Sequence, residues 1–141
     1  MDELRDFLDD IYDPGVVMAR IGHLPRNAQR EIEQITRIVR AAFGYGEAEM
    51  PEQGQILRIA LTGPSAERCG AGDEIGGYDF HIAVNIPECT DEVHWRFARR
   101  LIASEIGGQR AVTLAVTAKD CPAGIVLYDV GKDLPLNTRE L

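Results

Sequence analysis

The segment from Ile56 to Asn85 reads ILRIALTGPSAERCGAGDEIGGYDFHIAVN, and it decides the fold. Its first residues, 56–61, are apolar at almost every position, which predicts a strand buried on both faces. A glycine turn at Gly63 follows, and a second strand is predicted over 78–86, with Asp79 near its start. A glycine turn that opens a helix beside an acid-bearing strand is typical of sites that hold a phosphate and its metal.

Helical periodicity and turn residues place the other elements around this segment. A short helix is expected over 64–69, because proline suits a first helical turn, and the glycine-rich stretch 70–77 is expected to be a loop. Thr90 is the expected cap of a helix that ends near Ile106. The remaining predicted elements are helices over 1–12 and 26–43, a turn at 13–15, and strands over 112–117 and 125–128.

Strands that alternate with helices predict an α/β (α+β) fold, in which helices pack mainly on one face of a mixed sheet. At 141 residues the chain suits a single domain. We expect an N-terminal helical extension over 1–23, the main domain over 24–130 and a C-terminal tail over 131–141.

Composition limits where the protein works. No apolar run approaches the ~20 residues of a membrane span, and the acidic start argues against a secretory or mitochondrial signal. The cysteines Cys69, Cys89 and Cys121 form no CxxC pair, which fits free thiols in a reducing compartment. The sequence therefore predicts a cytoplasmic protein without a membrane segment.

Charge limits the class of partner. The net charge is −8, and a protein that binds nucleic acid generally needs a basic face, so this activity is not expected. Arginines nevertheless gather on two predicted helices, where they form either solvated helix faces or a phosphate-binding patch. These arginines are Arg26, Arg30, Arg37 and Arg40 on the first helix, and Arg96, Arg99 and Arg100 on the second.

Five stretches in this order resemble a minimal nucleotidyltransferase domain of the DNA polymerase β superfamily. They are LPRNAQREIE at 24–33, ILRIALTG at 56–63, IGGYDFHIAVN at 75–85, VTLAVT at 112–117 and GIVLYD at 124–129. The resemblance covers residues 24–130, and it implies transfer of a nucleotidyl group from a nucleoside triphosphate to a hydroxyl, with Mg²⁺ as cofactor. It also implies a partner, because active minimal domains of this family often work beside a small helical protein as a toxin–antitoxin pair.

In that family a Gly-Ser turn binds the phosphates, an Asp-x-Asp pair holds two magnesium ions, and a third acid lies on a neighbouring strand. Carried onto this chain, the resemblance makes Gly63 and Ser65 the phosphate cradle and Asp79 the catalytic metal ligand. The chain departs from the pattern at Pro64, which replaces the serine, and at Gly77, which replaces the first acid. The third strand also lacks an acid, so we expect impaired or absent catalysis.

His81 offers a different ligand pair, because residues i and i+2 of a strand point to the same face. Asp79 and His81 together suit zinc, manganese or nickel better than magnesium. Alternatively, His81 is a half-buried strand histidine with a local hydrogen bond, and Asp79 caps a loop amide.

Two classes of function remain open: an impaired nucleotidyltransferase, and a non-catalytic interaction module, antitoxin-like, that pairs with a small helical protein or forms a homodimer. For the second class, either Trp95 or the helix over 1–12 is the expected anchor of the partner surface. A small-molecule sensor that uses the glycine loop as a lid is a third option.

Overall fold

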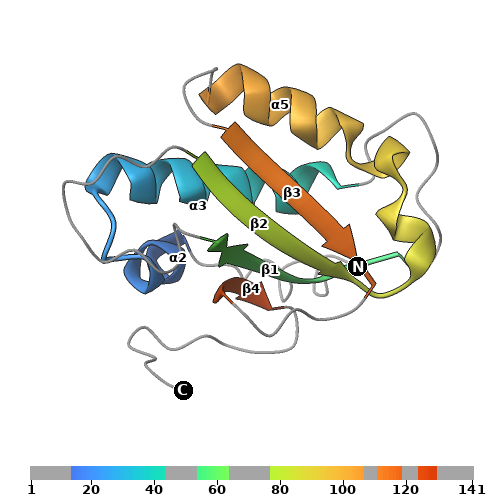
Figure 1. The fold of residues 1–141 in the computed structure, drawn as a ribbon, viewed down its shortest axis with the longest axis horizontal. Helices are drawn as coiled ribbons and strands as arrows, with labels where there is room; N and C mark the ends of the chain where they lie inside the picture. Colours follow the sequence, from blue (N-terminus) through green and yellow to red (C-terminus); the bar gives the residue numbers. More distant parts are fainter. Residues whose placement is uncertain (1–13, 44–53, 64–76, 107–110, 119–123, 130–141) are drawn as a thin grey trace, which may run out of the picture.

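The computed structural model of the chain describes residues 14–43, 54–63, 77–106, 111–118 and 124–129 (Figure 1). The helices are α2 (Pro14–Arg20), α3 (Arg26–Ala42) and α5 (Arg96–Ile106), with 3₁₀ turns η1 (Pro87–Thr90) and η2 (Glu92–His94); the strands are β1 (Ile56–Thr62), β2 (Gly77–Val84), β3 (Ala111–Thr117) and β4 (Ile125–Asp129). The helices expected over 1–12 and 64–69, the tail over 131–141 and Ser65 lie outside the described residues.

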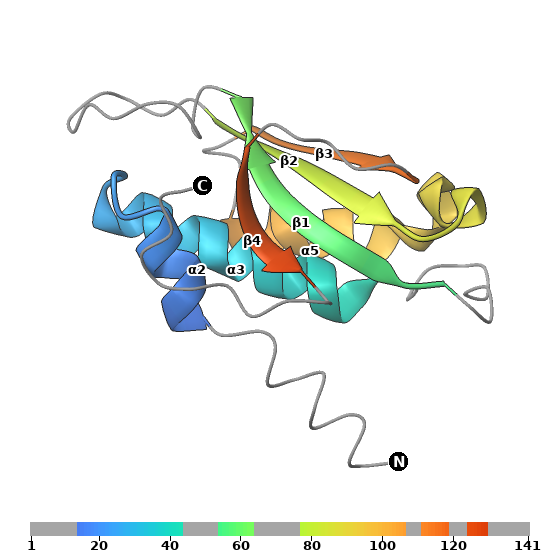
Figure 2. The same cartoon turned by 90° about the horizontal axis from the view of Figure 1, so that it is seen from below.

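The four strands form one mixed sheet in the order β3-β2-β1-β4. Strand β1 is antiparallel to both of its neighbours, whereas β2 and β3 are parallel. A parallel pair needs a long crossover connection, and α5 supplies it between β2 and β3. The helices lie on one side of the sheet (Figure 2). This arrangement confirms the predicted α+β class and the one-sided packing of the helices.

Helix α3 follows the periodicity predicted for it. Ile32, Ile35 and Val39 recur at helical spacing, are completely buried, and join the core between helix and sheet. Glu33 is buried too, although the sequence places it on the polar face of the helix. Its carboxylate pairs with Arg37 at 2.7 Å. Burial of this acid is therefore compensated by an ion pair within the helix.

Helix α2 corrects the expectation that residues 13–15 form only a turn. Pro14 is the first residue of the helix, a position where the missing N–H costs nothing, so the same letters that predict a turn also suit a helix start. Val17 and Ile21 are buried in the core, and α2 packs against α3 and β4.

The chain before α5 also differs from expectation. The helix begins at Arg96, after two 3₁₀ turns, rather than near residue 91. The expected cap, Thr90, is wrong: its hydroxyl donates to the carbonyl of Pro87 at 2.7 Å. Asp91 caps the 3₁₀ turn η2 rather than α5, and its carboxylate accepts the N–H of Val93 at 3.2 Å.

Trp95 is a core residue, so the expectation that it anchors a partner surface is wrong. Its exposed fraction is 0%, and its ring lies 4.7 Å from that of Phe43. The indole Nε1 donates to the carbonyl of Cys89 at 2.8 Å, which satisfies the polar atom of a buried tryptophan. Because α5 starts at Arg96, Trp95 precedes the helix, and its side chain lies in the core.

None of the helices in the described ranges is long and apolar enough to cross a membrane.

Candidate functional site at one end of the sheet

Side chains along β2 alternate between the core and the face that carries the candidate site. Tyr78, Phe80 and Ile82 are buried against the helices. Asp79 and His81 are half-buried and point to the opposite face, which the helices do not cover (Figure 2). The two predicted ligands therefore share one face of the sheet.

Gly63 and Asp79 lie in direct contact. Asp79 is paired with Thr62 across the antiparallel strands, and the Thr62 hydroxyl donates to the backbone carbonyl of Asp79 at 3.2 Å. Gly63 follows with a φ of 71°, in the left-handed region that favours glycine. A Cβ at this position would lie only 2.4 Å from Oδ2 of Asp79. The carboxylate thus occupies the space that a side chain at residue 63 would fill.

The neighbouring strand closes Gly77, the position that the resemblance compares with a first acid. A Cβ added to Gly77 would lie 2.4 Å from the backbone oxygen of Ala111 and 3.2 Å from the Ala111 side chain. The obstacle is backbone, which cannot move aside without breaking the parallel pairing of β2 and β3. The absence of an acid at Gly77 is therefore coupled to the close approach of β3.

Strand β3 faces the site with hydroxyl and methyl groups. Thr113 is paired with Asp79, and Ala115 is paired with His81. The imidazole Nε2 of His81 lies 2.8 Å from the hydroxyl Oγ1 of Thr117, one pleat further along β3. This hydrogen bond holds the ring toward β3 and uses the nitrogen that most often binds metals.

These donors do not fit a centre of two magnesium ions. Such a centre needs several carboxylates around two ions a few ångströms apart. Among the described residues at this end of β2 and β3, Asp79 supplies one carboxylate, Gly77 has no room for a side chain, and Thr113, which is paired with Asp79, carries a hydroxyl. In the described residues, no three His, Cys, Asp or Glu side chains are placed to share a metal.

Two features of this face were missed at the level of sequence. Gly124, just before β4, has a φ of 112°, and a Cβ there would lie 2.5 Å from the carbonyl oxygen of Leu61. The backbone at the start of β4 therefore lies in close contact with the end of β1, near Gly63. An isolated glycine directly before a predicted strand is the signal that marks such a close approach.

The second missed feature is an ion pair. Arg58 lies on the same face as Asp79, because it is paired with Ala83, and its guanidinium contacts Oδ2 of the Asp129 carboxylate at 3.1 Å. Four residues of strand separate Arg58 from Thr62, or about 13 Å. Arg58 therefore fixes β4 to β1 rather than neutralising charge near Asp79.

Cys89 is a free, buried thiol, in keeping with the prediction of unpaired cysteines. Burial, and secondarily the charge of Glu88, raise its pKa above the ordinary value, while a hydrogen bond from the backbone of Gln55 opposes the shift. A thiol of this kind is inert rather than nucleophilic.

Comparisons of the chain with protein-family models, with curated proteins and with solved structures found no match.

Proposed function

We propose that this chain is a nucleotidyltransferase-like domain that binds a nucleoside triphosphate through one divalent cation, Mg²⁺ or Mn²⁺, and has lost most of the transfer reaction. The observation that supports this proposal is the contact between the carboxylate of Asp79 and the turn at Gly63. It brings a candidate cation ligand beside Gly63, the first residue of the predicted phosphate turn, and a metal-bound phosphate requires both parts.

The reduced activity follows from the same end of the sheet. In-line transfer of a nucleotidyl group requires charge stabilisation on both the attacking and the leaving oxygen, which two metals usually provide. The closed position at Gly77 and the hydroxyl of Thr113 argue against a second metal. Pro64, which follows Gly63 in the sequence, has no N–H to donate to a phosphate oxygen. Binding is thus supported better than transfer, and we place this activity in the cytoplasm, where nucleoside triphosphates are available.

Calorimetry with ATP in the presence of Mg²⁺ or Mn²⁺ tests the binding. We expect metal-dependent heat with a dissociation constant between about 1 μM and 1 mM. Asp79→Asn removes the charge that holds the cation and should abolish the heat. Glu88→Gln, which removes an exposed carboxylate from η1, is the matched control and should bind like the parent chain. No heat at millimolar nucleotide with either metal would refute the proposal.

A second candidate is the interaction module, with a small helical protein or a second copy of the chain as partner. An apolar groove between α3 and α5 that includes the exposed side chain of Phe97 favours it. The two functions are separable by experiment, because the groove lies on the helical side and the Gly63–Asp79 contact on the open side of the sheet.

A further inference from the structure

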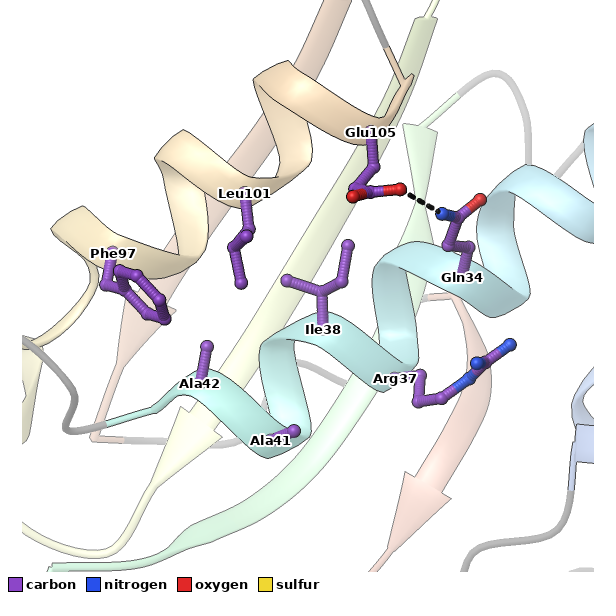
Figure 3. Close-up of a pocket in the computed structure, with 8 residues that line it drawn as sticks. All are labelled: Gln34, Arg37, Ile38, Ala41, Ala42, Phe97, Leu101 and Glu105. Atoms are coloured by element: carbon purple, nitrogen blue, oxygen red, sulfur yellow. Dashed lines mark hydrogen bonds between the residues drawn. The ribbon is translucent and has the colours of Figure 1, made fainter.

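Helices α3 and α5 leave a groove of about 400 Å³ between their outer surfaces. Figure 3 shows Ile38 and Ala41 on α3, and Phe97 and Leu101 on α5, around this groove. Phe97 is 36% exposed, a large fraction for an aromatic ring in this fold. The amide of Gln34 on α3 donates to the Glu105 carboxylate on α5 at 3.2 Å and bridges the two helices. The groove is thus apolar along its length and polar at that bridge.

The flanks of the groove are positively charged. On α3, Arg26, Arg30 and Arg37 are exposed and spaced so that they share one helical stripe, and Arg37 itself lines the groove. On α5, Arg96 and Arg100 are exposed beside the groove residues. Counting all charged side chains, α3 has four arginines against two glutamates, and α5 has three arginines against one glutamate. The helix pair is therefore cationic in a chain whose net charge is −8.

We propose that residues 1–12 of a second copy of this chain occupy the α3–α5 groove. This segment places Leu4, Phe7, Leu8 and Ile11 at helical spacing, which gives one apolar stripe. The charged residues of the segment are five acids and one arginine, so the segment is anionic, whereas the flanks of the groove carry the exposed arginines Arg30, Arg96 and Arg100. An amphipathic helix that inserts a few apolar anchors into a groove is a general mode of protein recognition, and the volume of the groove suits such anchors.

The position of α2 explains why the segment comes from a second copy. Helix α2 begins at Pro14 and packs against α3 and β4, while α5 lies on the other side of α3 (Figure 1). Only Asp13 separates the segment from α2. The helix that the sequence predicts over 1–12 would be about 18 Å long and 10 Å wide. To reach the groove of its own copy, that helix would have to reverse across α3 within one residue, so we infer that it binds a second copy. Exchange between two copies fills both grooves and gives a closed, two-fold symmetric dimer.

The test uses the full-length chain and measures its mass by light scattering and sedimentation at protein concentrations from about 1 to 200 μM. We expect a dimer whose dissociation constant is micromolar and increases as salt screens the charge pairs. Phe97→Asp in the groove and Leu8→Asp in the segment should each weaken dimerisation at least about tenfold. Ala103→Asp, an exposed change on α5 that does not line the groove, is the matched control and should dimerise normally. Circular dichroism verifies that each variant folds.

Mixing the two monomeric variants identifies the geometry. The Phe97→Asp chain keeps an intact segment, and the Leu8→Asp chain keeps an intact groove, so the mixture should form a heterodimer at protein concentrations at which each variant alone is monomeric. Contact between two grooves could not produce this rescue. The proposal is overturned if the parent chain is monomeric at about 200 μM, if Leu8→Asp dimerises like the parent, or if the mixture stays monomeric. A monomeric parent would leave a separate acidic helix as the occupant. Nucleotide binding is not involved, so this test and the calorimetric test can fail independently.

Discussion

Substitution of Gly63 by alanine should destabilise the protein by a predictable amount. An alanine at a φ of 71° takes on a left-handed conformation, which costs about 1 kcal/mol. Its Cβ would also lie 2.4 Å from Oδ2 of Asp79, so that carboxylate must leave its preferred rotamer, at a further cost of about 1 kcal/mol. We therefore expect Gly63→Ala to lower the free energy of unfolding by about 2 kcal/mol and Tm by about 8 °C.

A double-mutant cycle separates the two terms, measured by thermal and urea unfolding. In an Asp79→Ala background the steric part disappears, and Gly63→Ala should cost only about 1 kcal/mol. The matched control is Gly22→Ala, at a glycine without positive φ whose Cβ would lie 3.3 Å from the oxygen of Ala19; its effect should stay within about 1 kcal/mol of zero. A coupling energy below about 0.3 kcal/mol between residues 63 and 79 would refute the contact on which the proposed site depends.

Three other substitutions test the rest of the fold. Gly77→Asp should lower the free energy of unfolding by about 2 kcal/mol or more, because its Cβ meets the backbone of Ala111. For the same reason the new acid should not produce nucleotidyl transfer. Thermal unfolding measures the first effect and incorporation of labelled nucleotide the second, and a gain in transfer would contradict the steric argument. The raised pKa of Cys89 means that folding favours the neutral thiol, so its stabilising effect is complete below the ordinary pKa of 9.0 and is lost as the pH rises through the higher value in the folded state. Urea titrations at several alkaline pH values should show the free energy of unfolding falling more steeply with pH in the parent than in Cys89→Ala. The same dependence on pH in both proteins would exclude this contribution of Cys89. Trp95→Phe should cost about 2 kcal/mol, since it leaves the buried carbonyl of Cys89 without its donor and opens a small cavity. Because the chain has a single tryptophan, its fluorescence should be blue-shifted in the folded state, and an emission typical of exposed indole would show that the ring is not in the core.

The sequence is sufficient for the elements whose burial follows a regular period. The spacing of Ile32, Ile35 and Val39 predicts α3, and the alternation in β2 predicts which side chains face the helices. It fails where one local pattern serves two structures. Pro14 suits a turn and a helix start equally, and only the burial of Val17 against the rest of the core decides between them.

One part of the candidate site also follows from the sequence, and another part does not. The contact of Gly63 with Asp79 follows from an antiparallel pairing of two strands that are close in sequence. The closed position at Gly77 does not, because it depends on the parallel register with Ala111, a residue 34 positions later in the sequence. A missing acid can be read from the sequence, but the lack of room for one cannot.

The place of β1 in the middle of the sheet has a consequence for synthesis of the chain. Its partner β4 comes late: Arg58 and Asp129, which join the two strands, are 71 residues apart. Translation proceeds at about 5–20 residues per second, so one edge of β1 waits roughly 4–14 s before β4 has been made. During this interval an apolar strand exposes unpaired backbone groups, which template pairing with other chains. The nascent chain, rather than the finished protein, is therefore the species most in need of a chaperone.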